Sequence, residues 1–272
     1  MSEQILKALM QLFAIIAHPT SDAKDRRAIV EYFLKRQLNQ ETVKTYLKVF
    51  NDYYSIHQEK LSEKSKRKKR FSSSSVRVLK ICTQINEELT QRQKNVVLVQ
   101  LLEFVKSGEE LTEQEMAFVT TVAESFYIEQ DEYQEIEDFV FFGADKLPDT
   151  KKLLVIDNNE EFKHENAYHL TNPSLSGQLR VLEVTSANMY YIKYIGKSEL
   201  YLNGQLLEQE KVYVLNNGAS IRNPKIKPIY YGDIISQYNV DRIKSRIVFD
   251  AREIGYKFKT GAVGLHTMSF TE

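Results

Sequence analysis

Apolar residues in the N-terminal half of the chain recur at intervals of three and four positions, the spacing of one face of an α-helix. Residues 3–60 contain three such stretches, separated by the segment HPTSD and by the polar turn LNQET. Each predicted helix therefore carries one apolar stripe. The stripe residues are Ile5, Leu9, Leu12, Phe13 and Ile16, then Ile29, Phe33 and Leu34, then Val43, Tyr46, Leu47 and Phe50.

The helical pattern occurs twice. Aligning Leu12 with Leu101 places LFAIIAHPTSDAKDRRAIVEYF over LLEFVKSGEELTEQEMAFVTTV, at an offset of 89 residues that becomes about 90 further on. In both copies a helix ends at a turn, a second helix follows, and a polar turn opens a third. We expect the two three-helix units to bury their stripes against each other in one bundle over residues 1–145.

After Pro148 short runs of β-branched and aromatic residues replace the helical spacing. They lie about ten residues apart and end at Asn, Gly, Pro or Asp, which predicts a small antiparallel β-sandwich over residues 150–241. Residues 242–272 add further strands, so the expected fold class is α+β, in several domains. The predicted strands are LLVID, HLTN, GQLRVLEV, MYYIKYIG, ELYLNG, KVYVLNNG, ASIRNP and PIYYGDII, with turns at Asn158-Asn159, Asn203-Gly204 and Asn217-Gly218.

The composition is that of a folded, soluble protein. A chain of 272 residues with 42% apolar and 27% charged residues is large enough for two domains and is not disordered. It contains no apolar run of membrane-spanning length, and its N-terminus lacks the features of a signal peptide. Cys82 is the single cysteine, which excludes an internal disulfide and a cysteine-built zinc site and favours a cytoplasmic location.

The net charge of zero conceals charged blocks. Lys and Arg against Asp and Glu number 19 and 10 in residues 1–99, 1 and 13 in 100–145, and 17 and 14 afterwards, giving +9, −12 and +3. The basic run Lys64–Arg70 and the serines behind it predict an exposed flexible loop over residues 62–75. This run could contact an anionic membrane surface, nucleic acid or the acidic block, or remain solvated. No recognition element follows it, so we expect no nucleic-acid partner.

The stretch SGEELTEQEMAFVTTVAESFYIEQDEYQEIEDFV resembles the helical TerB-like domain, named after tellurite-resistance proteins, and the resemblance covers about residues 5–142. A metal hypothesis for some members rests on acidic residues beside an Asp-Gly turn. Here that turn reads Ser107-Gly108, without the leading Asp. The carboxylates that could still bind a hard cation are Glu109, Glu110, Glu113 and Glu115. We favour a solvated helix start whose carboxylates complement the helix dipole, and expect no metal.

Histidine and cysteine offer no alternative chemistry. The closest histidines, His164 and His169, lack the spacing of a zinc-binding helix. Cys82 falls at apolar helical spacing, as a buried small side chain does.

The stretch ELYLNGQLLEQEKVYVLNNGASIRNPKIKPIYYGDI resembles the C-terminal half of a forkhead-associated (FHA) domain, with Asn203-Gly204 at that family's Asn-Gly position. The Gly-Arg and Ser-x-x-His elements that bind phosphothreonine in the family are absent, although Arg180 could replace the missing arginine. We therefore expect a spacer or docking module without phosphopeptide binding. Its tyrosines are expected to be half-buried, while Tyr190, Tyr191 and Tyr194 could anchor a partner.

The segment RIVFDAREIGYKFKTGAVGLHTMSFTE looks like the first strands of an ATP-binding cassette: Arg246 to Asp250, a second strand through Tyr256 and Phe258, and a third from Leu265. In that family an aromatic residue on the second strand stacks on adenine, and Phe258 matches its position; ordinary hairpin packing is the alternative. No Walker A sequence G-x-x-x-x-G-K-[ST], Walker B strand or signature motif occurs. The chain itself is therefore expected to be non-enzymatic, with ATP and Mg required only by a full-length protein.

Together these resemblances imply a non-catalytic accessory or regulatory N-terminal region of a bacterial ABC transporter ATP-binding protein. Its partners would be the cassette and membrane domains of that transporter, and its place would be the cytoplasmic face of the membrane. Two alternatives stay open: a free-standing FHA-type adaptor that binds phosphopeptides, and a TerB-like protein that responds to metal or stress.

Overall fold

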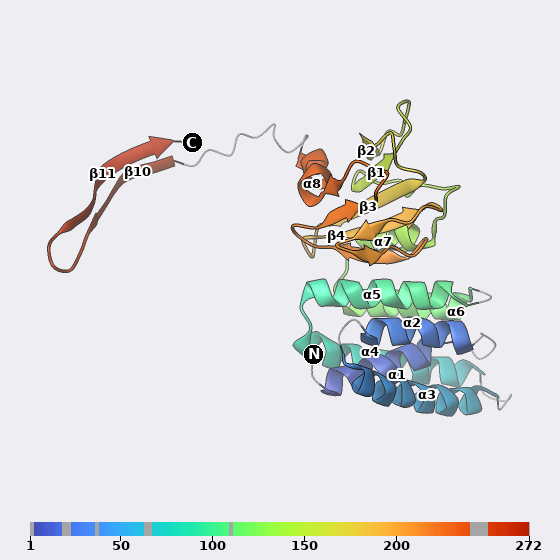
Figure 1. Ribbon diagram of the computed structural model, residues 1–272. Helices are drawn as coiled ribbons and strands as arrows, with labels where there is room; N and C mark the ends of the chain where they lie inside the picture. Colours follow the sequence, from blue (N-terminus) through green and yellow to red (C-terminus); the bar gives the residue numbers. More distant parts are fainter. Residues whose placement is uncertain are drawn as a thin grey trace.

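The computed structural model describes residues 3–17, 23–35, 38–62, 67–108, 111–239 and 250–271, which form an α+β fold (Figure 1). The helices are α1 Glu3–Ile16, α2 Ala23–Lys35, α3 Gln40–Ser62, α4 Arg67–Glu88, α5 Gln91–Lys106, α6 Glu113–Ser125, α7 Gln130–Phe141 and α8 Tyr231–Asn239. The strands are β1 Leu153–Asp157, β2 Ala167–Thr171, β3 Gln178–Val184, β4 Met189–Ile195, β5 Tyr201–Leu202, β6 Gln205–Leu206, β7 Val212–Leu215, β8 Ser220–Arg222, β9 Ile229–Tyr230, β10 Asp250–Lys257 and β11 Val263–Thr271.

The internal repeat is present in the helical region. Helices α2 and α6 begin at Ala23 and Glu113, and helices α3 and α7 begin at Gln40 and Gln130, so both pairs are 90 residues apart. Helix α1 packs against α5, where the rings of Phe13 and Phe104 meet edge to face with centroids 5.2 Å apart. The two apolar stripes thus share one core, as the sequence predicts.

Helix α4 corrects the prediction of a flexible loop over residues 62–75. The helix begins at Arg67 and includes the serine tract, while residues 63–66 and the side chains of 67–74 lie outside the described part of the chain. The tract contains no Gly or Pro, and the stripe of Val78, Cys82 and Ile85 fixes the helical phase behind it. Contacts of the basic run Lys64–Arg70 therefore stay a prediction.

The β-region consists of two sheets. One has the order β2-β1-β3-β4-β7 and the other β6-β5-β8-β9. Most pairs are antiparallel, but β1 and β2 are parallel, because the long segment between them returns the chain in the same direction. Asn203 and Gly204 have φ values of 52° and 83° in the tight turn between β5 and β6, as Asn-Gly hairpins require.

Asn217-Gly218 forms a turn, as predicted, and this turn connects β7 of the first sheet to β8 of the second. One local prediction in the β-region is wrong. PIYYGDII forms only the short strand β9 and then helix α8. The Asp233 carboxylate accepts the Tyr230 backbone N–H at 2.9 Å near the start of that helix. Ile234 and Tyr238, four positions apart, are buried on one face of this helix. The apolar residues here thus follow the 3.6-residue period of a helix and not the alternation of a strand.

The first sheet is buried on both faces. Leu153, Leu182 and Tyr191 face the helical bundle and belong to its core, whereas the neighbouring positions Leu154 and Ile192 face the second sheet and α8. Figure 1 shows the sheet stacked over the layer that contains α5, with α7 between them. The helical and β-regions therefore share a continuous apolar core, and they meet as layers of one body.

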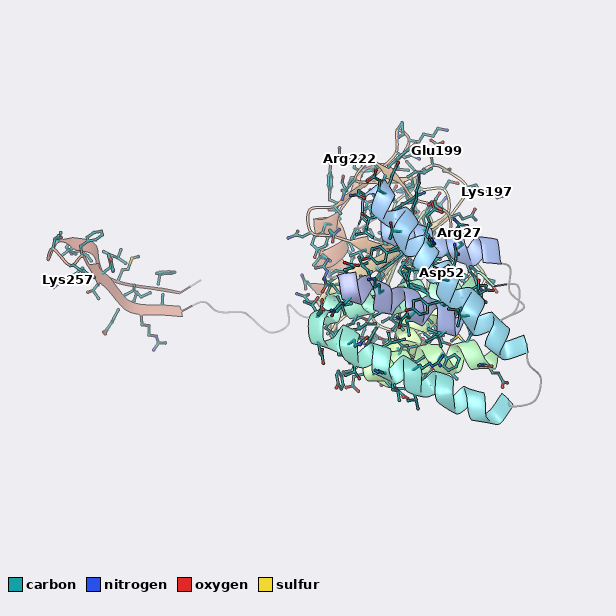
Figure 2. All side chains as sticks on the ribbon, turned by 90° about the horizontal axis from the view of Figure 1, so that it is seen from below. Arg27, Asp52, Lys197, Glu199, Arg222 and Lys257 are labelled. Atoms are coloured by element: carbon teal, nitrogen blue, oxygen red, sulfur yellow. The ribbon has the colours of Figure 1, made fainter. Side chains whose placement is uncertain are left out.

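Strands β10 and β11 form a separate antiparallel hairpin (Figures 1 and 2). The predicted strand from Arg246 lies outside the described residues up to Asp250, where β10 begins. Strand β10 runs through Tyr256 and has a bulge at Glu253, where φ is 50°. Residues 240–249 lie outside the described part. Within that part, no helix combines the length and apolar character that crossing a bilayer requires.

Candidate functional site

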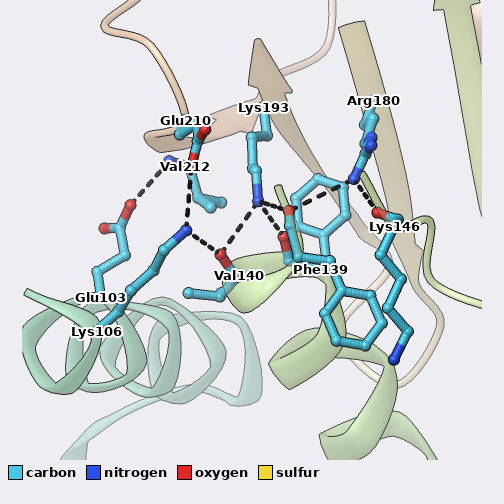
Figure 3. A network of polar contacts seen from close by, with 10 residues as sticks. Glu103, Lys106, Phe139, Val140, Lys146, Arg180, Lys193, Glu210 and Val212 are labelled. Atoms are coloured by element: carbon cyan, nitrogen blue, oxygen red, sulfur yellow. Dashed lines mark hydrogen bonds and ion pairs between the residues drawn. The ribbon is translucent and has the colours of Figure 1, made fainter. Parts of the chain in front are cut away.

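The C-terminal end of helix α7 meets the first sheet at a buried contact that contains several charged side chains (Figure 3). The last carbonyl groups of a helix have no partner within the helix and carry the negative end of its dipole. Here the carbonyl oxygens of Phe139, Val140 and Phe142 accept hydrogen bonds from side chains of other elements. We call this arrangement the α7 junction, formed by these carbonyls with Lys106, Arg180 and Lys193.

Lys193 on β4 lies at the centre of the α7 junction. Its ammonium group is fully buried and donates to the carbonyl oxygens of Phe139 at 2.7 Å, Val140 at 3.1 Å and Phe142 at 2.7 Å. Three donors on one ammonium thus meet three acceptors, which satisfies the charged group without a carboxylate. Helix α7 is thereby fixed to the middle of the sheet.

Arg180 on β3 is the direct cross-strand neighbour of Lys193. Like charges in that position repel each other. Arg180 is also fully buried, and its guanidinium donates to the carbonyl oxygen of Lys146 at 2.9 Å and to that of Phe142 at 3.4 Å. The two cations are tolerated side by side because both face the electronegative end of α7.

A third cation and two carboxylates complete the junction on the side of α5. Lys106 donates to the Val140 carbonyl oxygen at 2.9 Å and lies 3.4 Å from the Glu210 carboxylate. Glu103, one turn earlier on α5, accepts the backbone N–H of Val212 at 2.8 Å. Because Val212 is in β7, the outermost strand of the first sheet, this carboxylate satisfies a donor of the sheet edge.

Burial shifts the pKa of the central groups toward their neutral forms. It lowers the pKa of Lys193 to about 7, and the charges of Lys106 and Arg180 act in the same direction. Burial also lowers the pKa of Arg180 to about 10. In the opposite sense, burial raises the pKa of Glu103 to about 6, against the lowering effect of the Val212 N–H.

Glu103→Gln should remove a pH dependence of stability. Because the folded-state pKa of Glu103 is about 6 and its ordinary value is 4.5, the folded protein binds the extra proton more tightly. The free energy of unfolding therefore falls as pH rises from 4.5 to 6, by about 2 kcal/mol for a shift of this size. Gln keeps an acceptor for Val212 and does not titrate. Urea unfolding at several pH values should show this fall in unfolding free energy in the natural protein and not in Glu103→Gln. Equal dependences on pH in the two proteins would contradict the prediction.

The α7 junction can hold two layers in one orientation, but it offers no access to a substrate. Lys193 and Arg180 are fully buried. The donors of Lys193 are directed at main-chain carbonyls, and those of Arg180 at main-chain carbonyls and at the side-chain oxygen of Gln178. The sequence contained a signal for Lys193, a lone lysine inside the apolar run MYYIKYIG. Lys193 is not among the site residues predicted from the sequence.

The structure corrects three predicted sites. Arg180 cannot replace a phosphate-binding arginine, because it is enclosed at the α7 junction. Tyr190, Tyr191 and Tyr194 are at most 6% exposed and cannot anchor a partner, since both faces of β4 are covered. Glu115 was predicted to be solvated at the start of a helix. In the structure its side chain is 1% exposed and forms an ion pair with the buried Arg26.

The remaining candidates have ordinary surroundings in the described residues. Glu113 is exposed, Glu109 and Glu110 lie outside the described part, and the part described contains no group of three metal-binding side chains. His169 bonds to Asp157 at 2.9 Å and stacks on Phe162. Cys82 is fully buried, as predicted, and burial raises its pKa to about 12.

Residues 7–138 match the family model of the tellurite resistance protein TerB. The TerB-like character of the helical region is therefore confirmed. No curated protein matches the chain. A crystal structure of the MEK1 FHA domain in complex with a HOP1 phosphothreonine peptide is 28% identical, over 30% of this chain and 80% of that one, with a TM-score of 0.24. A second MEK1 FHA structure is 25% identical, over 30% and 71%, with a TM-score of 0.22. These TM-scores are too low to assign the fold.

Proposed function

We propose that this chain is a non-catalytic accessory region of an ABC transporter ATP-binding protein. In this proposal the TerB-like helices and the sheets form one docking unit, and the β10–β11 hairpin supplies the first strands of the cassette domain. The observation that carries the proposal is the uncovered apolar surface of the hairpin. Its large apolar side chains are 37–55% exposed: Ile254, Tyr256, Phe258, Val263, Leu265, Met268 and Phe270.

An uncovered hairpin of this composition favours a further sheet as its partner. Two strands alone are marginally stable in water, and their open edges and apolar faces invite pairing. The sequence GLHTMSFTE on β11 supplies the resemblance to the cassette family, and the partner would be the rest of that domain. The hairpin is then the connection between the docking unit and the part that hydrolyses ATP.

The environment of Phe258 is compatible with a role in adenine stacking. Its ring is 51% exposed at the end of the hairpin and meets Tyr256 edge to face, with centroids 5.0 Å apart. A Cβ atom on Gly264 would lie 2.6 Å from the Phe258 ring, so this glycine makes room for the two aromatic rings. An exposed and laterally supported ring can accept a base on its face.

The α7 junction supports a docking role for the remainder of the chain. Buried hydrogen bonds from charged side chains connect the helices to the sheet, so that a displacement of one layer is transmitted to the other. We place this unit in the cytoplasm at the inner face of the membrane, where Lys64–Arg70 would be attracted to anionic headgroups. ATP and Mg would bind only in the full-length protein.

The proposal is tested by extending the chain along its natural reading frame beyond Glu272. We expect a Walker A sequence within a few dozen codons and ATP binding by the extended protein, measured with a fluorescent nucleotide. Phe258→Ala should weaken that binding about tenfold, since stacking on a base contributes about 1–3 kcal/mol. Phe270→Ala is the matched control, because Phe270 is 42% exposed and lies near the other end of the hairpin. It should leave the affinity for ATP within about twofold of that of the natural protein.

Three results would overturn the proposal: a reading frame without a phosphate-binding loop, ATP hydrolysis by the 272-residue chain alone, or equal effects of the two substitutions. Micromolar, sequence-selective binding of phosphothreonine peptides would favour the free-standing adaptor instead. We expect none, because Arg180 is enclosed and cannot reach a phosphate.

A further inference from the structure

A second buried ion pair lies inside the helical region. The guanidinium of Arg26 on α2 is 2.5 Å from a carboxylate oxygen of Glu115 on α6, and both side chains are 1% exposed. Such a pair is stable only when each charge is well compensated, because removing ions from water costs several kcal/mol each. Its position between the two helices makes it part of the contact between the two repeats.

Arg26 and Glu115 occupy nearly equivalent positions of the repeat. The ungapped alignment of Leu12 with Leu101 places Arg26 opposite Glu115, one residue away from the 90-residue spacing of helices α2 and α6. Helices α1 and α5 pack against each other, so equivalent helices lie on either side of that contact. Neighbouring places in the two copies thus hold an arginine in one and a glutamate in the other, and the fold brings them together.

The surroundings stabilise both charges. The Glu115 carboxylate accepts the Thr112 hydroxyl at 2.8 Å and the Thr112 backbone N–H at 3.3 Å, in a capping box at the start of α6. The Arg26 guanidinium lies over the ring of Phe104, 5.2 Å from its centroid. Within the described residues the guanidinium nitrogens make no further hydrogen bond, so the ion pair with Glu115 and the Phe104 ring are what compensate the arginine charge.

The guanidinium also reaches the turn that follows α5. A Cβ atom on Gly108 would lie 2.3 Å from an Arg26 terminal nitrogen, so the turn has glycine where the arginine passes. This is the Ser107-Gly108 turn to which the TerB-like resemblance attaches a metal hypothesis. Arg26 fills the space beside that turn and neutralises Glu115, which the hypothesis counts among the ligands.

We infer that Arg26 is the resident cation of this site and that the chain takes no divalent metal there. A divalent ion needs several oxygen ligands and a place near the carboxylate, and the guanidinium occupies that place. The two repeats are then held together permanently, whatever the cation concentration. This inference stands independently of the proposed ABC transporter function.

The test measures melting temperature in chelator and in millimolar Ca²⁺ or Mg²⁺, at matched ionic strength. The natural chain should melt at the same temperature in all three conditions. Arg26→Gln leaves a buried, uncompensated carboxylate, so it should melt lower in chelator and recover several degrees with Ca²⁺ or Mg²⁺, which bind the folded form. The double variant Arg26→Gln with Glu115→Gln has no buried charge and should not respond to either ion.

Two further variants keep the test decisive. Arg27→Gln makes the same change at the next, exposed position of α2 and should behave as the natural chain does (Figure 2). If Arg26→Gln does not fold in chelator, Arg26→Lys retains a cation and should fold without responding to metal. The inference is overturned by saturable binding of Ca²⁺ or Mg²⁺ to the natural chain that Glu115→Gln abolishes. An Arg26→Gln variant that folds without any response to both ions also overturns it.

Discussion

Replacing Phe104 by alanine should cost about 3–5 kcal/mol of unfolding free energy, the range found when a fully buried phenylalanine is truncated. Phe104 is completely buried where the two helical repeats meet. Its ring contacts Phe13 with centroids 5.2 Å apart and Phe50 with centroids 6.2 Å apart. It also lies beneath the Arg26 guanidinium, so the substitution removes packing from both repeats and a cation–π contact together.

Urea denaturation followed by far-UV circular dichroism measures this loss. Phe258→Ala is the matched control, because it deletes the same atoms from a ring that is half exposed in the hairpin. That variant should change the free energy of unfolding by less than about 0.5 kcal/mol. Comparable losses at the two positions would show that the repeats do not depend on a common core.

Lys193→Met should cost about 2–4 kcal/mol. The substitution preserves side-chain length but removes one donor from each of the Phe139, Val140 and Phe142 carbonyls, at a helix end enclosed by the sheet. Relief from burying the lysine charge offsets part of this cost. The loss of acceptor partners should prevail, because a buried carbonyl at a helix terminus has no water to replace them.

The pH profile gives a second signature of Lys193. Because burial lowers its folded-state pKa to about 7 from 10.5, the unfolded chain binds more protons between these values. The lysine therefore contributes a rise in unfolding free energy with pH from 7 to 10.5, and Lys193→Met should reduce that slope. Lys197→Met, on the exposed loop after β4, should leave stability and slope unchanged (Figure 2). An unaltered slope in Lys193→Met would contradict the role given to this lysine.

A loss of stability in Lys193→Met would also bear on the docking role. If the α7 junction keeps the layers together, the helical region and the sheets of Lys193→Met should no longer unfold in a single cooperative transition. Fluorescence of the tyrosine-rich sheet and circular dichroism at a helical wavelength would then give separate transitions. Coincident transitions would mean that the shared apolar core suffices.

The sequence by itself determined the local elements of this protein. Apolar spacing fixed the helices and their repeat, the change of pattern near Pro148 marked the beginning of the sheets, and Asn203-Gly204 specified a hairpin turn. Each of these depends on neighbours within a few positions. Periodicity reports which face of an element is apolar, and that information is complete in a short stretch of chain.

Only the tertiary structure decided what covers each apolar face and what satisfies each buried charge. Arg180 looks like an ordinary strand residue in the sequence, and the lone Lys193 in its apolar run has no visible partner there; the end of α7 supplies the partners of both. Glu115 looks like a surface carboxylate until the fold brings Arg26 beside it. Their partners lie tens of residues away in the chain. A buried charge is stable only through groups that the folded chain brings within hydrogen-bonding distance, and no local pattern of residues encodes that distance.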